Sequence, residues 1–290
     1  VKVTKEGKQL KAKERVVADG IASETQCNTL RNMVMTRGKA GDGYNGRTSP
    51  HTRYELFLGL SVPQVLQSEA LVGDGYEHLI LKPSEISPHT HHELFRGMTI
   101  YRASKLAYDE RISLGALRDF LELSESSRLF AEKYFNLTKP LYFDFTHLVC
   151  RTAVDGSNSA REDLSHPVHA DNCNLMPDGS CLKEYPSFFN RDYSAILYLN
   201  DDFEGGEFFF AHANKSEQVS VRPKCGRLVA FNAGHFHGVK AVKKGQRCAL
   251  ALWFTHQAMF KELAHIQARK SLQTKEEEMK TRGRKRREDL

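Results

Sequence analysis

The stretch RDYSAILYLNDDFEGGEFFFAH, residues 191–212, decides the fold class of this 290-residue chain. Two short runs rich in aromatic and β-branched residues, YSAILYLN at 193–200 and GEFFFAH at 206–212, flank a cluster of Asp and Gly. Runs of this composition, separated by turn-forming residues, are typical of strands in an antiparallel sheet. The stretch therefore predicts two strands joined by a tight connection.

Runs of the same kind occur on both sides of this stretch. They are LYFDFTHLVCRTAV at 141–154, QVSVRP at 218–223, GRLVAFN at 226–232 and RCALALWF at 247–254. Six or more short strands spaced closely by turns indicate an antiparallel sandwich or barrel. We therefore expect the β core of the chain to occupy residues 141–257.

The first 140 residues have a different pattern, which predicts helices and loops. Apolar residues recur at helical spacing in TQCNTLRNMVMT at 25–36 and in LGALRDFLELSESSRLFAEKYF at 114–135. We therefore expect residues 1–140 to form a helical and loop region that precedes the β core.

An internal repeat lies between the two predicted helices. GDGY at 41–44 recurs at 73–76, and SPHTRYELFLG at 49–59 recurs as SPHTHHELFRG at 87–97, with eight of eleven positions identical. This agreement indicates a local duplication, but two copies are too few for a solenoid. Turn-forming residues dominate both copies, so we expect loops that lead into short ordered segments. We expect HTHH at 89–92 to be a surface loop and not a metal site.

The composition excludes several classes of protein. Hydrophobic residues make up 40% of the chain and charged residues 27%, which is ordinary for a globular domain. No run approaches the roughly 18 apolar residues of a membrane span, and the opening VKVTKEGKQLKAKER has no apolar signal-peptide segment. Basic residues gather at both ends, but no nucleic-acid-binding motif accompanies them, so we expect no nucleic-acid partner.

The end of the chain suggests a compartment. Residues 258–290 are expected to form a charged tail, and the closing Arg287-Glu288-Asp289-Leu290 resembles the KDEL-type signal that retains proteins in the endoplasmic reticulum. Six cysteines fit an oxidising lumen, and Cys173 and Cys181 enclose a short polar loop that makes them the first disulfide to expect. N-glycosylation is open to two sequons, Asn136-Leu137-Thr138 and Asn214-Lys215-Ser216.

His169 and Asp171, in HPVHAD at 166–171, suggest a metal site. On a strand alternate side chains share a face, so both side chains would point the same way. His237, beside the predicted strand GRLVAFN, offers a third ligand. Two histidines and one carboxylate leave coordination positions open, as a non-haem Fe(II) oxygenase requires.

Arg247 makes this pattern more specific, because it follows His237 by ten positions and opens the predicted strand RCALALWF. A turn at Lys243-Lys244-Gly245 would return the chain and bring Arg247 beside the metal. A guanidinium group matches a carboxylate in geometry, and these oxygenases must hold the distal carboxylate of 2-oxoglutarate. We therefore assign that role to Arg247.

Each residue of this pattern also has a structural interpretation. His169 could be a core histidine bonded to a backbone carbonyl, and Asp171 could be a turn residue. His235 competes with His237 as the third ligand, and we prefer His237 because it gives the ten-residue spacing to the arginine. Trp253 and the aromatic residues of GEFFFAH are expected in the core.

Several longer motifs carry a family resemblance. They are THLVCRTA at 146–153, HPVHADNC at 166–173, RDYSAILYLNDDFEGGEFFF at 191–210, PKCGRLVAF at 223–231, HGVKAV at 237–242 and GQRCALALWFT at 245–255. With GDGYNGRTSPHT at 41–52, they cover most of residues 24–255. This set is similar to the catalytic region of the collagen prolyl 3-hydroxylases, the leprecan family.

The resemblance implies a mainly β fold with flanking helices, namely the double-stranded β-helix of the jelly-roll or cupin type. It implies Fe(II), 2-oxoglutarate, O₂ and L-ascorbate as cofactors. The family's iron ligands fall on His169, Asp171 and His237, and its 2-oxoglutarate-binding arginine falls on Arg247.

The implied substrate is a proline of unfolded procollagen chains, hydroxylated at C3. A Pro-rich chain favours a pocket with aromatic walls, and Tyr193 and Tyr198 are candidates for them. Tyr193 is also a candidate for cofactor binding. Two alternatives stay open: a non-catalytic scaffold among other collagen-modifying proteins of the endoplasmic reticulum, and a hydroxylase of another residue or protein.

The sequence departs from the family pattern in three places. The helical-repeat region that usually lies upstream is absent from this sequence. The family has one GDGY…SPHT unit where this chain has two, so residues from about 60 to 97 are expected to be an insertion. After Thr255 the continuation HQAMFKE differs from the usual one.

Overall fold

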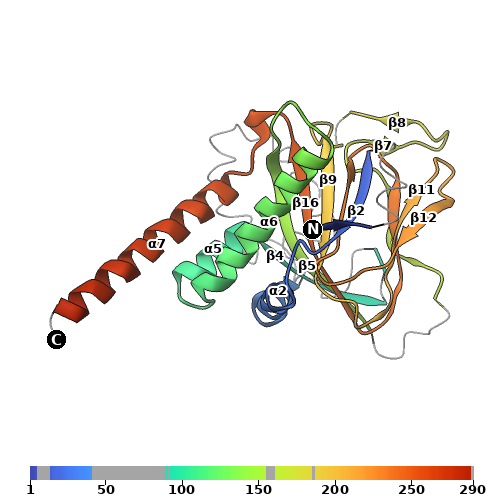
Figure 1. The fold of residues 1–290 in the computed structure, drawn as a ribbon. Helices are drawn as coiled ribbons and strands as arrows, with labels where there is room; N and C mark the ends of the chain where they lie inside the picture. Colours follow the sequence, from blue (N-terminus) through green and yellow to red (C-terminus); the bar gives the residue numbers. More distant parts are fainter. Residues whose placement is uncertain (5–13, 41–88, 91, 155–160, 185–186, 289–290) are drawn as a thin grey trace, which may run out of the picture.

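Two antiparallel sheets face each other in the computed structural model, and a layer of helices covers the outer face of the larger sheet (Figure 1). This is the expected double-stranded β-helix with flanking helices. The structure describes residues 1–4, 14–40, 89–90, 92–154, 161–184 and 187–288.

The larger sheet has eight strands in the order β1-β2-β13-β9-β16-β5-β4-β3. The predicted strands of the β core form its centre, where β16 pairs with β9 on one side and with β5 on the other. In sheet order the strands are β1 (Lys2–Val3), β2 (Arg15–Asp19), β13 (Leu228–Asn232), β9 (Tyr193–Tyr198), β16 (Gln246–Thr255), β5 (Tyr142–Ala153), β4 (Glu93–Thr99) and β3 (Lys39–Ala40).

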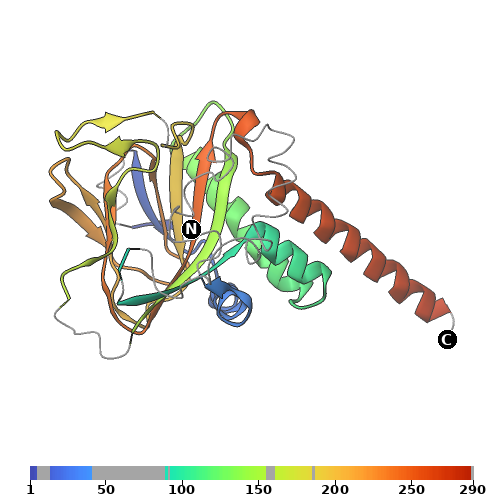
Figure 2. The same cartoon turned by 180° about the vertical axis from the view of Figure 1, so that it is seen from behind.

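The smaller sheet carries the two histidines among the predicted metal ligands and lies on the other side of the molecule from the helices (Figure 2). Its strands, in sheet order, are β12 (Glu217–Val221), β11 (Phe208–Ala211), β14 (His237–Lys240) and β6 (Leu164–His169). Two further two-stranded ladders join β10 (Glu204–Gly205) to β15 (Val242–Lys244) and β7 (Asn174–Leu175) to β8 (Cys181–Leu182).

Side-chain alternation along the central strands builds two cores. On β9, Ala195 and Leu197 point toward the helices, whereas Ile196 and Tyr198 point between the two sheets. The aromatic residues of GEFFFAH fill the second core, as expected: Phe208 and Phe210 are fully buried there against Phe231. The main sheet is therefore covered on both faces.

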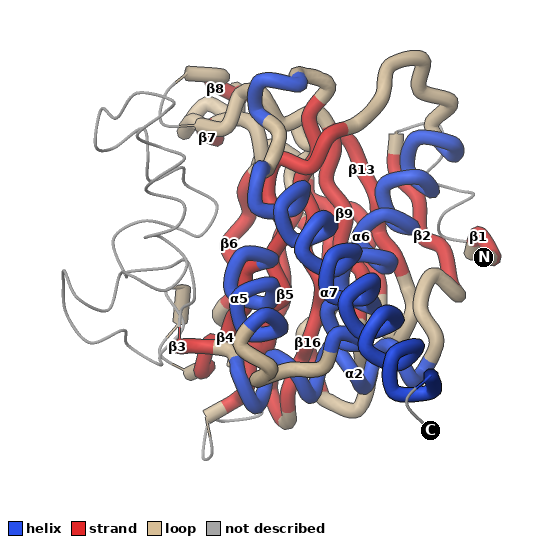
Figure 3. Tube along the Cα trace, turned by 90° about the vertical axis from the view of Figure 1, so that its left-hand side faces the viewer, coloured by secondary structure: helices blue, strands red, loops and turns tan. Residues whose placement is uncertain are grey.

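Four helices of the described chain form the covering layer (Figure 3). α2 (Glu24–Arg37) begins with a capping box in which the Ser23 hydroxyl accepts a hydrogen bond from the Gln26 backbone. α6 (Leu114–Tyr134) begins at Ser113 in a similar way and agrees closely with the predicted helix at 114–135. α5 (Ile100–Tyr108) and α7 (Leu263–Glu288) complete the layer.

Part of the predicted charged tail is a packed helix. After the 3₁₀ turn η3 (Ala258–Phe260), α7 packs its first turns against α5 and α6. Small or apolar residues at helical spacing make this possible, because Ala264, Ala268 and Leu272 are buried. Residues 289 and 290 of the retrieval-like tetrapeptide lie outside the described residues. No described helix combines the length and the apolar character that crossing a membrane requires.

The region expected to be helix and loop also supplies strands. β2 pairs with β13, and β4 pairs with β5, so both extend the main sheet. Their sequences, RVVAD and ELFRGMT, are short and contain charged residues, which weakens any local strand signal. Pairing with a neighbouring strand decides their conformation.

β4 belongs to the second copy of the duplicated motif. Residues 93–97, which we expected to be part of an insertion, therefore lie in the main sheet. The first copy and both GDGY units lie outside the described residues. The second copy makes its contacts through four residues, His89, Thr90, Glu93 and Phe95. The first copy has the same residue type at each of these positions, namely His51, Thr52, Glu55 and Phe57.

Three disulfides connect the described chain. Cys173–Cys181 is the predicted pair and closes the β7–β8 hairpin. Cys150–Cys248 joins directly opposed residues of β5 and β16. Cys27–Cys225 joins α2 to the segment before β13 across 198 residues of sequence.

Disulfides stabilise chiefly by restricting the unfolded chain, so the long connection should matter more than the short one. We expect C27A/C225A to lower the free energy of unfolding by about 3–5 kcal/mol, and the matched C173A/C181A by about 2 kcal/mol. Urea unfolding followed by circular dichroism measures both. Equal losses, or the reverse order, would contradict the prediction.

Candidate metal centre

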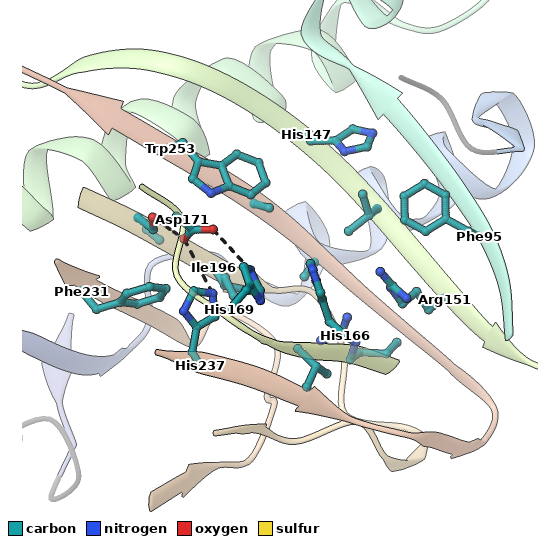
Figure 4. A pocket seen from close by; sticks show the side chains of 17 residues that line it. Phe95, His147, Arg151, His166, His169, Asp171, Ile196, Phe231, His237 and Trp253 are labelled. Carbon is teal, nitrogen blue, oxygen red and sulfur yellow. Dashed lines mark hydrogen bonds and ion pairs between the residues drawn. The ribbon is translucent and has the colours of Figure 1, made fainter. Parts of the chain in front are cut away.

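A cavity of about 70 Å³ lies between the two sheets and collects the four residues predicted for the site. His169, Asp171, His237 and Arg247 all line it. Figure 4 shows the two imidazoles, from the smaller sheet, and the Asp171 carboxylate pointing toward one another, with Trp253 on the facing strand of the larger sheet.

Strand register brings the two histidines together. His169, at the end of β6, lies directly opposite His237, the first residue of β14, and their ring centroids are 4.3 Å apart. The Nδ1 atom of each ring lies 2.8 Å from a backbone carbonyl, Pro167 O for His169 and His235 O for His237. Since a carbonyl can only accept, each Nδ1 carries the proton and each Nε2 is left as a lone-pair donor for a metal.

Asp171 comes from the loop after β6 and not from the strand itself. Its backbone N–H donates to Ala233 O, and the buried Ser194 hydroxyl donates to its Oδ2 atom at 2.6 Å. The two carboxylate oxygens lie 3.4 Å from His169 Nε2 and 3.6 Å from His237 Nε2. One ligand atom from each of the three residues therefore falls within 4.8 Å of the others.

Electrostatics favours the protonation states that a metal requires. Burial by itself would raise the pKa of the Asp171 carboxyl, but His237 and His169 outweigh burial and hold that pKa well below its usual range. Burial lowers the pKa of His237 to about 4. At neutral pH the cluster thus offers a carboxylate beside a neutral imidazole.

The donor set fits a divalent metal of the Fe(II) type. Two imidazole nitrogens and one carboxylate oxygen, all from one side of the cavity, match the facial arrangement of non-haem iron sites. Among the described residues, the rest of the cavity wall supplies no further carboxylate, so coordination positions would face the cavity.

Arg247 supplies a positive charge at the same cavity. It is 6% exposed, and its Nε atom has no hydrogen-bond partner among the described residues. Tyr198 lies beside it, and burial raises the pKa of that phenol to about 12 although the guanidinium acts in the opposite direction. The glycine at 206 leaves room for this side chain, because a Cβ there would lie 3.1 Å from Arg247 Cδ.

A second arginine faces the cavity opposite the first. Arg151 on β5 pairs directly with Arg247 on β16 and also lines the cavity. Its guanidinium donates to Ser165 O and lies 3.7 Å from the fully buried Glu93. Glu93 therefore offsets part of the charge of Arg151.

Other predicted residues lie elsewhere. Tyr193 faces the helices, where its hydroxyl donates to Glu14 and its ring stacks on Phe135 at 5.2 Å. It does not line the cavity, so the structure gives its predicted role in cofactor binding no support. His235, the competing third ligand, instead receives a hydrogen bond from Arg15 Nε at 2.6 Å.

The surface-loop interpretation of HTHH at 89–92 needs correction. His89 stacks on the cavity-lining His166 at 4.2 Å, and Thr90 is buried and donates to Asp163. His166 in turn stacks on His169 at 4.1 Å. Packing against β6 draws this segment inward, an interaction that turn composition does not reveal.

Sequence reasoning missed two residues of the site. Ser194 donates a hydrogen bond to the Asp171 carboxylate. It lies four residues before Tyr198 on β9, and because alternate residues of a strand share a face, Ser194 could have been placed on the same face as Tyr198. Trp253, which we expected in the core, lines the cavity. It lies six residues after Arg247 on β16, so the same alternation could have placed it on the face of Arg247.

Removal of the Ser194 hydroxyl should loosen Asp171, because groups that orient a metal ligand typically contribute 10–100-fold to metal affinity. We expect S194A to weaken Zn²⁺ binding by roughly 30-fold in competition with a chelating dye. S194T should restore most of the affinity, and S216A, a surface control, should leave it unchanged. Unchanged affinity in S194A would show that Asp171 is held without this bond.

Comparison with known proteins agrees with this geometry. A family model described as the 2OG-Fe(II) oxygenase superfamily matches residues 160–255. Prolyl 3-hydroxylase 2 of Gallus gallus is 43% identical over 272 residues, which cover 92% of this chain and 34% of the relative. Prolyl 3-hydroxylase 1 of Mus musculus is 39% identical over 272 residues, which cover 92% of this chain and 32% of the relative.

The chain thus spans about a third of the length of these relatives. Among solved structures, the viral collagen prolyl hydroxylase of Paramecium Bursaria Chlorella virus-1 aligns at 15% identity with a TM-score of 0.43, covering 84% of this chain and 90% of its own. The sequence relatives and the family model give the classification. Residues 160–255 thus match the 2OG-Fe(II) oxygenase superfamily, and the chain is similar over 92% of its length to prolyl 3-hydroxylases.

Proposed function

We propose that this chain is the oxygenase domain of an Fe(II)- and 2-oxoglutarate-dependent dioxygenase that hydroxylates C3 of prolines in unfolded procollagen chains. One observation carries the proposal: the three residues that could hold a metal share their cavity with Arg247, whose buried Nε atom has no hydrogen-bond partner among the described residues. The match to the family model supports the cofactor pair, and the names of the relatives support proline and its C3 position.

The overall reaction consumes 2-oxoglutarate, O₂ and a proline C–H bond, and yields succinate, CO₂ and a proline C–OH. Iron, when bound by His169, Asp171 and His237, supplies the oxidising chemistry. The protein must therefore hold the co-substrate, keep the ligands oriented and exclude water from the reacting atoms.

The chain has residues for each of these tasks. Arg247 would pair with the distal carboxylate of 2-oxoglutarate, and the buried Tyr198 hydroxyl lies beside it. Ser194 orients Asp171. Phe231, Ile196 and Trp253 line the cavity with apolar surface, which disfavours water near the reacting atoms.

Ascorbate and the compartment belong to the same proposal. Ascorbate would keep the iron in the ferrous state between turnovers. The three disulfides fit an oxidising lumen, and the retrieval-like Arg287–Leu290 fits the endoplasmic reticulum, where procollagen chains are unfolded before assembly. Other collagen-modifying proteins of that lumen are the partners we expect.

Incubation with Fe(II), 2-oxoglutarate and ascorbate tests the function, with and without a short unfolded peptide of Gly-Pro-4Hyp triplets. We expect succinate formation that depends on the peptide, and one added oxygen at C3 of proline, located by mass spectrometry and NMR. D171A should form no hydroxylated peptide, because it removes the only carboxylate among the three residues that would hold the metal.

Two other outcomes would change the assignment. Succinate without peptide oxidation would keep the oxygenase and exclude this substrate. A folded, metal-loaded chain that forms no succinate under any condition would favour the scaffold role.

Replacement of Arg247 should weaken the binding of 2-oxoglutarate and nothing else. Lysine keeps the charge but loses the paired N–H groups that match a carboxylate. We therefore expect R247K to raise the KM for 2-oxoglutarate by roughly 30-fold, and R247M by more. R227K, which alters an ion pair with Asp19 outside the cavity, is the matched control. An unchanged KM in R247M would remove Arg247 from the co-substrate site.

A further inference from the structure

The three residues that could hold the metal differ in how deeply they are buried. The side chains of Asp171 and His237 are 3% and 5% exposed, whereas that of His169 is 28% exposed. His237 also packs against Phe208 and Phe231, whose ring centroids lie 5.3 and 4.7 Å from its own. His169 ends β6, which is the last strand of the smaller sheet among the described residues. A strand in this position has a neighbour on one side only, so its orientation requires support from outside the sheet.

A stack of imidazole rings gives His169 such support. The centroid of the His166 ring lies 4.1 Å from that of His169 with 14° between the planes, and Figure 4 shows the two rings side by side. His89 stacks on His166 in turn, at 4.2 Å and 20°. A ring packed face to face with another cannot turn freely, so the stack restricts the ring plane of His169. Because His89 belongs to the second copy of the duplicated motif, the stack joins the metal strand to that copy.

Glu93 anchors the second copy to the same strand. Its carboxylate is fully buried and accepts hydrogen bonds from the Ser165 hydroxyl at 2.7 Å and from the Val242 backbone N–H at 2.9 Å. Ser165 directly precedes His166 on β6. The second copy is therefore bonded to β6 at the residue next to the imidazole stack.

Two arginines and a second carboxylate surround this anchor. Arg151 Nη1 and Arg161 Nη2 lie 3.7 and 3.4 Å from the Glu93 carboxylate. Arg161 also pairs with Asp163 at 2.7 Å, and the Thr90 hydroxyl donates to Asp163 at 2.6 Å. Buried ions lose their hydration, so a cluster of this kind adds little net stability compared with apolar packing. Stability alone therefore does not account for the cluster, which connects the second copy to β6 at defined atoms.

We propose that His166 is the positioning residue that sets the ring plane of the metal ligand His169. The second copy of the duplicated motif holds His166 in place through His89 and Glu93. The inference rests on the metal centre of the proposed function and extends it to a motif that the function had left without a role. His166 acts through His169, as groups that orient a metal ligand do, and such groups contribute about 10–100-fold to metal affinity.

Co²⁺ tests the positioning role without turnover, because its visible absorption bands depend on the arrangement of its ligands. We expect H166L to weaken Co²⁺ binding roughly tenfold and to shift these bands. H166F keeps a flat ring and should retain most of the affinity and the parental bands. D171A should show no such bands, which assigns the spectrum to the triad. H212L, at an exposed histidine between β11 and β12, is the surface control.

The duplication supplies a matched control for each residue of the second copy. We expect H89L to weaken Co²⁺ binding about threefold, less than H166L because it removes the outer ring of the stack. H51L, the same change in the first copy, should leave the affinity unchanged. E93Q should weaken binding at least as much as H89L, whereas E55Q should not. Losses in the first-copy variants with none in H89L and E93Q would overturn the assignment to the second copy.

Stability measurements separate positioning from folding. Circular dichroism shows whether each variant is folded, and urea unfolding measures its stability. A loss of Co²⁺ affinity that only follows the loss of stability, with unshifted bands, would show a purely structural role for His166 and overturn the inference. If E93Q does not fold, the comparison of H89L with H51L still decides.

The outcomes also distinguish this inference from the function on which it depends. An H166L chain with the parental Co²⁺ affinity and bands would overturn the inference and leave the proposed function standing. A parent chain that binds Co²⁺ and oxidises no proline, with the expected losses in H166L and H89L, would refute the function and leave the positioning role.

Discussion

The antiparallel pairing of β6 with β14 places His169 directly opposite His237, and every other part of the site depends on this register. A slip of one residue would turn one imidazole to the opposite face of the sheet. The core between the sheets prevents such a slip, because Phe210 on β11 pairs with His237 and is fully buried against Phe231. Apolar packing therefore specifies the geometry of a polar site.

Features that depend on local sequence could be predicted. The helices at α2 and α6 follow from apolar periodicity, and the central strands follow from short β-branched and aromatic runs between turns. His169 with Asp171, and His237 with Arg247, could be predicted because the members of each pair are close in sequence, whereas the β6–β14 pairing that brings the two pairs together has no local signal. Neither the pairing of β2 and β4 with distant strands nor the packed start of α7 has such a local signal.

Features that depend on distant contacts could not be predicted. Tyr193 and Tyr198 are equivalent in composition, and only the position of the helices shows that the first faces away from the cavity. The duplicated motif has a different difficulty, because its two copies contain the same contact residues and sequence cannot decide which copy enters the sheet.

Under the proposed function, the crosslinked strand pair β5–β16 forms the part of the cavity that meets the anionic co-substrate. Cys150–Cys248 and Arg151–Arg247 are successive cross-strand pairs, one facing the helices and the other facing the cavity. Like charges directly opposite each other are unfavourable, and Glu93 beside Arg151 offsets only part of this cost. The Cys150–Cys248 disulfide, one position away, holds the strands together. The two guanidinium groups are therefore brought close to each other when the chain folds and the disulfide forms. The cationic end of the cavity is thereby preorganised, and little reorganisation energy is left for the moment of binding.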